Sequence, residues 1–337
     1  YILVLISLGK QLIGFLELNN ATVERYGYWY LVISSPTMFF SFFTTLFTRI
    51  FNSYGNNSGA LKINAIGIII NIILDPILIY IFKFGVLGAG IATLISQIVM
   101  FIIYLVKAKG ILSYDFKIGI NKTMIFEIIK LGIPMSFQRI LFTWVNIMLA
   151  KMISAYGAEA IAAQKIGLQI ESVTYMIIGG LNGAIASFEG QNFGAKKYGR
   201  IKEGYNRALE IGIIYSIFTA MIFMFLNESI VRLFIKDSYT VQIAGNYLKV
   251  VAFSQIFSTT EMVSNGMFTG VGMPKIPSTI SIIFTVLRIP MAMVLVNYFG
   301  LNGVWISIAA SSILKGSTAY IMYLCTIRRR YKECLIN

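Results

Sequence analysis

The chain has 337 residues, of which 57% are hydrophobic and only 12% are charged. Soluble domains carry about 25% charged residues, so this chain has too few to cover a water-exposed surface. With a mean hydropathy of +0.76, the composition excludes a soluble enzyme, a disordered chain and a secreted disulfide scaffold, and it favours a polytopic helical membrane protein. There is no histidine, and the two cysteines lie near the C-terminus, so neither a disulfide framework nor a metal site is predicted.

Apolar runs of membrane-spanning length follow one another along the chain. The first, at residues 1–8, lacks the charged start of a signal peptide and indicates the end of a helix that begins upstream. Lys and Arg gather in alternate connections, which predicts that these connections face the cytoplasm. The net charge of +14 then reflects topology and contact with membrane lipids, and no nucleic acid partner is expected. The nine further predicted spans are residues 26–48, 60–82, 86–106, 131–152, 162–188, 207–227, 246–269, 276–298 and 302–327.

The two halves of the chain resemble one another. At an offset of 217 residues, Phe51 matches Phe268 and Gly55 matches Gly272. The second copy starts near Glu127 and holds six spans, and an even number of spans gives both copies the same orientation. We therefore expect an all-α polytopic membrane protein with two pseudo-symmetric bundles of six helices, the first lacking its first two helices and most of the third. The expected domains are a partial N-terminal bundle at 1–110, a cytoplasmic linker at 111–126 and a C-terminal bundle at 127–337.

An acidic residue lies in the middle of the span 60–82, although an ionisable group at bilayer depth costs about 2.5–3.5 kcal/mol. Asp75 follows Asn71 by one helical turn, and Asn64, two turns further back, shares their face. Pro76 removes one helix hydrogen bond and frees a carbonyl nearby. A carboxylate, an amide oxygen and a free carbonyl make a hard-oxygen site for Na⁺ or a proton. The alternative is a buried Asp–Asn hydrogen bond that only locks helices together.

Two more acids lie within spans of the second bundle. Glu261 shares a helical stripe with Ser258 and Asn265, and Glu171 shares one with Gln164. Both stripes should face the second bundle or its cavity, because lipid would not solvate them. Glu261 could bind a cation or a cationic substrate, and the alternative is that it pairs with a basic neighbour. The basic residues available for such a pair are Arg288 and Lys315.

Four segments carry a resemblance to a known family. The chain resembles the multidrug and toxic-compound extrusion (MATE) family of cation-coupled antiporters, of the MOP type. The resemblance covers the whole chain, and the segment 164–175 is similar to the bacterial drug-efflux branch. The four segments, in chain order, are Asn71-x-x-x-Asp75-Pro76, Gly132-Ile133-Pro134, Gly190-Gln191-Asn192-Phe193-Gly194-Ala195 and Gly266-Met267-Phe268-Thr269-Gly270-Val271-Gly272.

The resemblance implies an antiporter of the cell membrane, not an enzyme, in which an inward Na⁺ or H⁺ gradient drives export of amphipathic, cationic drugs or toxic compounds. It implies no cofactor beyond the coupling ion, with small drug-like molecules and membrane lipids as partners and a monomeric state. The alternative is a lipid-linked sugar or polysaccharide flippase of the same superfamily. That function would need several basic residues facing the cavity, and Arg139 and Arg288 keep it open.

The family's ion site can be carried over residue by residue. Its Asn, Asp and Thr correspond to Asn71, Asp75 and Thr93, so the resemblance implies cation coupling there, with Na⁺ as one option at Asp75. An Asp on the family's first helix has no counterpart in this chain. Where some members have an acid on the seventh helix, this chain has Gln138 beside an arginine, which leaves the ion stoichiometry open. The residues expected to line the substrate cavity are Glu261, Glu171, Gln164, Gln138, Ser258 and Asn265.

Overall fold

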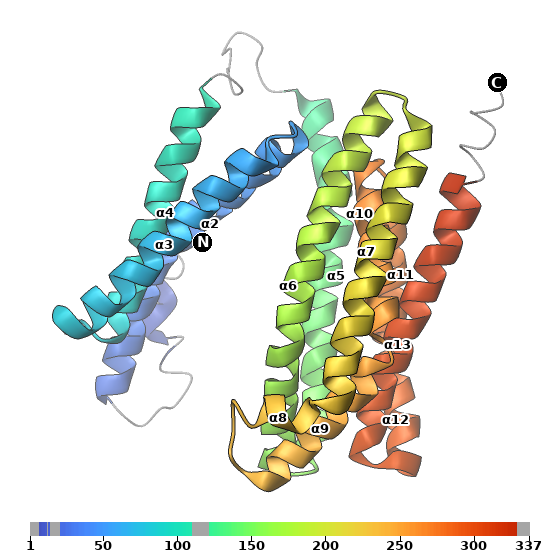
Figure 1. Ribbon diagram of the computed structural model, residues 1–337. Helices are drawn as coiled ribbons and strands as arrows, with labels where there is room; N and C mark the ends of the chain where they lie inside the picture. Colours follow the sequence, from blue (N-terminus) through green and yellow to red (C-terminus); the bar gives the residue numbers. More distant parts are fainter. Residues whose placement is uncertain (1–6, 12, 14–20, 110–120, 329–337) are drawn as a thin grey trace. The chain divides into compact units, whose positions relative to one another are not determined.

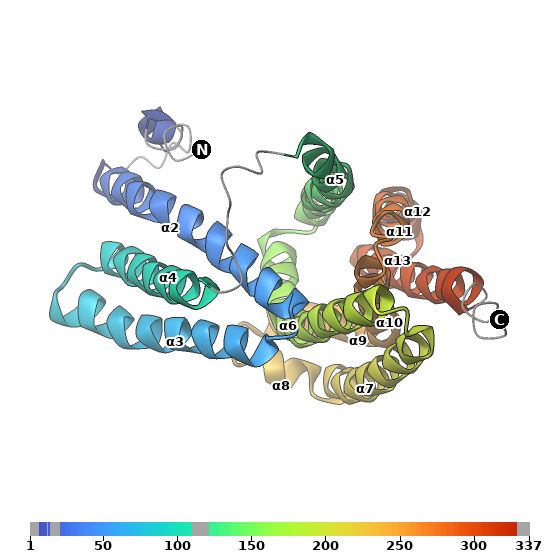
Figure 2. The ribbon, with the colours of Figure 1, turned by 90° about the horizontal axis from the view of Figure 1, so that it is seen from above.

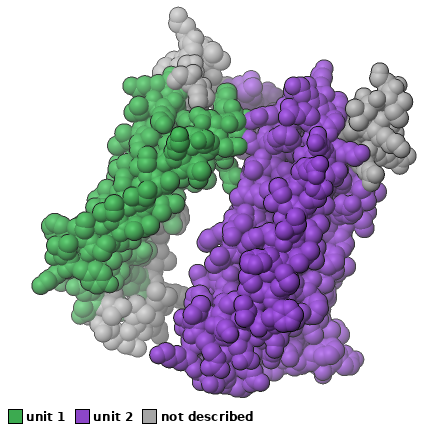
Figure 3. All heavy atoms as spheres, in the orientation of Figure 1, with its two compact units in different colours: residues 1–119 green, residues 120–337 purple. Residues whose placement is uncertain are grey.

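The computed structural model describes residues 7–11, 13, 21–109 and 121–328. In this described part the secondary structure is helical, without strands, which confirms the all-α class. The chain divides into two compact units, residues 1–119 and 120–337, coloured separately in Figure 3. Most of the expected linker, residues 111–126, lies outside the described residues. Its last part, residues 122–126, belongs to the first helix of the second unit.

Unit 1 is built on α2 (Ala21–Ser53), α3 (Asn57–Pro76) and α4 (Val86–Ala108). The helix α4 packs against both of the others, and Figure 2 shows the three side by side. Pro76 has no N–H to continue the α-helical ladder, and the chain widens there into the π-helical turn η1 (Ile77–Ile81). The π-type bond runs from the Phe82 N–H to the Ile77 carbonyl at 3.0 Å.

Unit 2 is a larger bundle, in which α10 contacts α6, α7 and α13 (Figure 1). Glycines permit close approach of these helices. A Cβ at Gly266 of α10 would lie 2.6 Å from the Asn182 carbonyl oxygen of α6, and one at Gly316 of α13 would collide with the Phe257 main chain of α10. The elements are α5 (Lys122–Ser154), α6 (Ala158–Gly194), α7 (Tyr198–Phe225), α8 (Asn227–Val231), α9 (Ser238–Ala252), α10 (Gln255–Gly270), α11 (Lys275–Val286), α12 (Arg288–Phe299), α13 (Leu301–Met322) and η2 (Tyr323–Arg328).

Two spans predicted as single helices are each broken into two. The span 246–269 breaks between α9 and α10, where the Ser254 N–H donates to the Val251 carbonyl at 2.9 Å in a tighter, 3₁₀-type turn. The span 276–298 breaks at Leu287, between α11 and α12. Pro290 follows, and its missing N–H leaves the Val286 carbonyl without its usual helical partner. Sequence hydropathy detects neither break, because both lie within apolar surroundings.

Among the described residues, five helical segments are long and apolar enough to cross a membrane by length and composition. Each coincides with a predicted span, and many of their large apolar side chains are exposed, as lipid contact requires. The helices therefore indicate a multi-pass membrane protein. The five segments are Glu24–Ser53, Asn57–Ile81, Val86–Ala108, Tyr198–Phe225 and Lys275–Phe299.

Candidate ion and substrate sites

The structure brings the three predicted ion-site residues of unit 1 together. The Asn71 amide donates to Asp75 Oδ1 at 3.5 Å and to Thr93 Oγ1 at 3.4 Å. The Thr93 hydroxyl donates a hydrogen bond to the Ala89 carbonyl at 2.9 Å. Its oxygen is therefore the acceptor of the bond from the Asn71 amide. The two bonds from Asn71 are longer than the usual 2.7–3.2 Å for N–H···O, so these oxygens are held loosely. Loosely held oxygens of this kind suit a hard cation or a proton.

Helix packing places these side chains. Asn71 and Asp75 lie four residues apart on α3 and therefore share a face. Gly88, in the first turn of α4, lies against η1, because a Cβ there would be 2.8 Å from the Leu78 carbonyl carbon. This close approach lets α4 run along α3 and carry Thr93 to the Asn71 amide.

Asn64, which the sequence places on the same helix face, has other partners in the structure. Its carbonyl oxygen accepts a hydrogen bond from the Tyr104 hydroxyl at 3.1 Å, and Tyr104 also pairs with Thr48 at 2.8 Å. Thr48 lies on α2 and Tyr104 near the end of α4, so a separate polar cluster ties the three helices together. A shared face on one helix does not determine which neighbouring helix supplies the partner.

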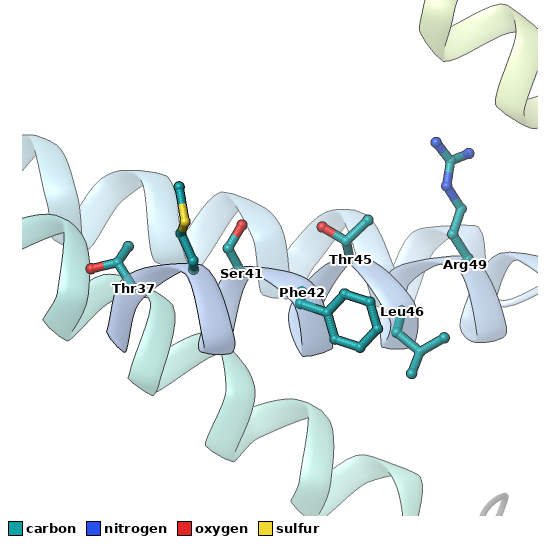
Figure 4. A pocket seen from close by; sticks show the side chains of 7 residues that line it. Thr37, Ser41, Phe42, Thr45, Leu46 and Arg49 are labelled. Atoms are coloured by element: carbon teal, nitrogen blue, oxygen red, sulfur yellow. The ribbon is translucent and has the colours of Figure 1, made fainter. Parts of the chain in front are cut away.

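A hollow of about 530 Å³ runs along one face of α2. Figure 4 shows Thr37, Ser41, Thr45 and Arg49 along it, at successive helical turns. None of the three ion-site residues lines this hollow. The hollow and the ion site are therefore separate features of unit 1.

Glu171 of α6 is the most tightly held acid of unit 2. It is only 4% exposed and accepts hydrogen bonds from the Tyr175 hydroxyl at 2.9 Å and the Tyr247 hydroxyl at 2.6 Å. The ring of Tyr247 packs edge-on against Trp305, with centroids 5.1 Å apart. Arg288 interacts electrostatically with Glu171. The carboxylate of Glu171 is thus compensated by two hydroxyls and a guanidinium, which suits a fixed charge better than a site open to a ligand.

Glu261 of α10 is held less completely. It is half-buried, and its Oε1 accepts a hydrogen bond from the Ser281 hydroxyl of α11 at 2.7 Å. Lys315 of α13, buried at 5% exposure, interacts electrostatically with Glu261. The ion pairs within 4 Å in the described part are Arg207–Glu210 and Arg232–Glu228, both exposed, so Glu261 and Lys315 attract across a wider separation.

The remaining predicted cavity residues fall at different depths of unit 2. Ser258 and Gln164 are buried, at 3% and 5% exposure, on α10 and α6. Asn265 is half-buried, and its Oδ1 has no hydrogen-bond partner within the described residues. Gln138 of α5 is half-buried, and no hydrogen bond between described residues joins it to either acid. The structure therefore gathers Ser258 and Asn265 on the Glu261 helix and leaves Gln138 apart.

Three polar residues in the interior of unit 2 were not predicted from the sequence. Tyr247 donates to Glu171 from 76 residues away, and no sequence signal marks that pair. Gln255 is fully buried and interacts with the Glu171 carboxylate. Glu189 is fully buried, and both of its carboxylate oxygens lack hydrogen-bond partners among the described residues. Tyr175, one helical turn after Glu171, is the only partner that spacing could have revealed.

Comparison with known proteins identifies a family domain in the second unit. The MatE family model matches residues 134–294. The multidrug export protein MepA of Staphylococcus aureus is 30% identical over 304 residues, which are 87% of this chain and 65% of that protein. A probable multidrug resistance protein, NorM of Thermotoga maritima, is 27% identical over 317 residues, with the same shares of 87% and 65%. The chain therefore spans about 65% of the length of these curated relatives.

Solved structures show the shared fold. The Vibrio cholerae MATE transporter VcmN in the bent form gives a TM-score of 0.85 at 21% identity, covering 97% of this chain and 75% of that one. An outward-facing multidrug resistance MATE family transporter of the MOP superfamily gives 0.87 at 21% identity, with coverage of 97% and 75%. Together with the matched segment and the apolar helices, these similarities show that this chain is a multi-pass protein of the cell membrane that carries a MATE family domain at residues 134–294.

Proposed function

We propose that the protein is a cation-coupled antiporter that exports amphipathic, cationic compounds on an inward Na⁺ or H⁺ gradient. One observation carries this proposal, namely the convergence of Asn71, Asp75 and Thr93 at the end of α3, next to the π-turn. Relatives named for multidrug export and resistance support the substrate class. The proposal includes no enzymatic activity and no cofactor beyond the coupling ion.

Asp75 is the coupling group in this proposal. Its carboxylate can bind Na⁺ together with the Thr93 oxygen, or it can bind a proton and become a hydrogen-bond donor. Either event changes the long bonds that Asn71 makes to both residues. Because η1 follows directly, a changed hydrogen-bond pattern acts where the helix is already irregular, as π-turns at functional sites commonly are. Ion binding would then shift the balance between inward-facing and outward-facing states.

Glu261 is the substrate-binding acid in this proposal. It is held by a single hydroxyl at 2.7 Å, whereas Glu171 is held by two tyrosines and interacts with Arg288. A carboxylate with spare acceptor capacity attracts a cationic compound in a low-dielectric interior. The cavity is proposed to be completed by Ser258, Asn265, Gln164, Gln138 and Glu171. Small drug-like molecules and membrane lipids are the proposed partners of a monomer, with no nucleic acid.

The flippase alternative has weaker support. A pyrophosphate would need several basic side chains free to meet it, but Arg139 is exposed on α5. Arg288 is buried and donates to the Ser311 hydroxyl at 2.9 Å and to Ser312 at 3.4 Å. Because its guanidinium already has these partners and faces an acid, drug export is the better-supported function.

Reconstitution in liposomes tests the proposal. We expect an imposed Na⁺ or pH gradient to drive movement of tetraphenylphosphonium, and Asp75→Asn to abolish it while leaving equilibrium binding of the same cation intact. The amide keeps the shape of the side chain but neither titrates nor carries charge. Glu203→Gln, which neutralises an exposed acid on α7, serves as the matched control. Export by Asp75→Asn at the parental rate would show that Asp75 is only a structural hydrogen-bonding group.

A further inference from the structure

Lys315 is a buried ammonium in the interior of unit 2. It lies on α13 at 5% exposure. Lysine is almost never buried to this degree without a counter-charge, because removing an ammonium from water costs several kcal/mol. In the described part no carboxylate lies within 4 Å of it, although Glu261 interacts with it electrostatically.

A close helix contact brings the segments that carry Lys315 and Glu261 together. Its neighbour Gly316 lies directly against the Phe257 main chain, so α13 and α10 are in close contact at this level. Glu261 follows Phe257 by one helical turn and therefore lies on the same side of α10. The stem of the lysine is long and flexible, so its ammonium can approach or leave Glu261 while the two helices stay in place.

The buried charges that interact with Lys315 or Glu171 have partners of their own. Glu171 has its two tyrosine hydroxyls, and Arg288 is fixed by the Ser311 and Ser312 hydroxyls. Arg288 also repels Lys315, and this repulsion favours the Glu261 side. In this group Lys315 is thus the cation with the freedom to move, and Glu261 is the acid with room for another partner.

We propose that Lys315 is a built-in counter-cation for Glu261, which an incoming organic cation has to displace. The inference rests on the proposed function, because it assigns a specificity-determining residue to the acid proposed to bind substrate. A cation that docks at Glu261 releases the ammonium, while a neutral molecule gains nothing from the acid. Because the lysine has to be displaced, it weakens the binding of monovalent cations at Glu261. When no substrate is bound, it compensates the charge of the buried carboxylate.

Equilibrium binding to the purified full chain tests this role. The probe is tetraphenylphosphonium, and triphenylphosphine oxide is the neutral comparison. Lys315→Met removes the competing ammonium but keeps an unbranched apolar stem, and we expect tetraphenylphosphonium to bind roughly five- to tenfold more tightly. Binding of the neutral compound should not change. Lys249→Met, which removes an exposed lysine from α9, should bind both compounds as the parent does.

A double-mutant cycle separates this role from a general loosening of the bundle. The tighter binding of tetraphenylphosphonium by Lys315→Met should vanish when Glu261→Gln is added, because the lysine then has no carboxylate with which to pair. Unchanged or weaker cation binding by Lys315→Met, or a gain that persists without Glu261, would overturn the proposal. If Lys315→Met does not yield folded protein, Lys315→Gln answers the same question. A gain in binding supports the lysine role even if gradient-driven export fails, so the two proposals fail separately.

Discussion

The Tyr247 hydroxyl donates a 2.6 Å hydrogen bond to the Glu171 carboxylate, joining α9 to α6 across 76 residues of sequence. Both side chains are buried, so this bond adds to the compensation that the Tyr175 hydroxyl and Arg288 give this charged group. The ring of Tyr247 packs edge-on against Trp305 in the apolar core, so this tyrosine connects the acid to the core.

Removing this hydroxyl should destabilise unit 2. For Tyr247→Phe we expect a loss of about 1.5–3 kcal/mol, the range for a hydrogen bond to a charged group, seen as a lower melting temperature in detergent. Tyr298→Phe changes an exposed tyrosine of α12 and should melt as the parent does. In a Glu171→Gln background the effect of Tyr247→Phe should shrink, because the acceptor is no longer charged. An equal loss in both backgrounds would mean that the ring, and not the bond, is responsible.

The Glu189 carboxylate, which has no hydrogen-bond partner among the described residues, predicts a stabilising substitution. Glu189→Met replaces a fully buried polar group by an unbranched apolar one, and we expect a gain of about 1–3 kcal/mol, the cost of an unsatisfied buried group. Thermal melting is the measurement. Gly204→Ala should lower stability instead, because its Cβ would collide with the Phe188 ring and lie 2.9 Å from Glu189 Oε1. A strong loss of stability in Glu189→Met would show that Glu189 does have a stabilising partner.

The contact between α10 and α13 predicts a contrast between two glycines. Gly316→Ala should lower stability by about 1–3 kcal/mol, because the added methyl meets the Phe257 main chain, which cannot yield as a side chain would. Gly180→Ala, on α6, meets nothing within 4 Å and should stabilise the helix by roughly 0.5–1 kcal/mol. Melting temperatures of the two variants decide the matter. Equal shifts for both would argue that the helices are not in tight contact at Gly316.

Asp237, in the connection before α9, predicts an acid-sensitive contribution to stability. Hydrogen bonds from Thr240 lower the pKa of this carboxyl below its usual 3.8, the bond from the hydroxyl more than the bond from the backbone N–H. A lowered folded pKa means that its contribution is complete above the unfolded pKa and is lost as the pH falls through the folded one. Asp237→Asn keeps a good helix cap, so it should melt near the parent at pH 7 yet lose less stability on acidification. Parallel acid profiles for the two proteins would contradict this.

Helical periodicity and hydropathy predict the spans and the residues that share a helix face. Asn71 and Asp75 could be paired because four residues make one turn, whereas Thr93 came only from the family resemblance. Tyr247 lies in an apolar stretch, so its bond to Glu171 needs the tertiary fold. The break at Leu287 and the partners of Asn64 likewise depend on which helix lies alongside, and a single sequence does not encode that in any local pattern.

The π-turn after Pro76 accommodates one extra residue in a continuous helix. Each residue of an α-helix advances the side-chain direction by about 100°, and a π-turn accommodates one residue more than the α-helical repeat. Asp75, before the turn, faces the ion site, while Leu78, within it, meets Gly88. If one residue were deleted from Ile77–Ile81, the widened turn would close into an ordinary α-helical turn, and the irregular backbone next to Asp75 would be lost. The backbone surroundings of the carboxylate therefore depend on the length of a segment whose only polar side chain is Tyr80.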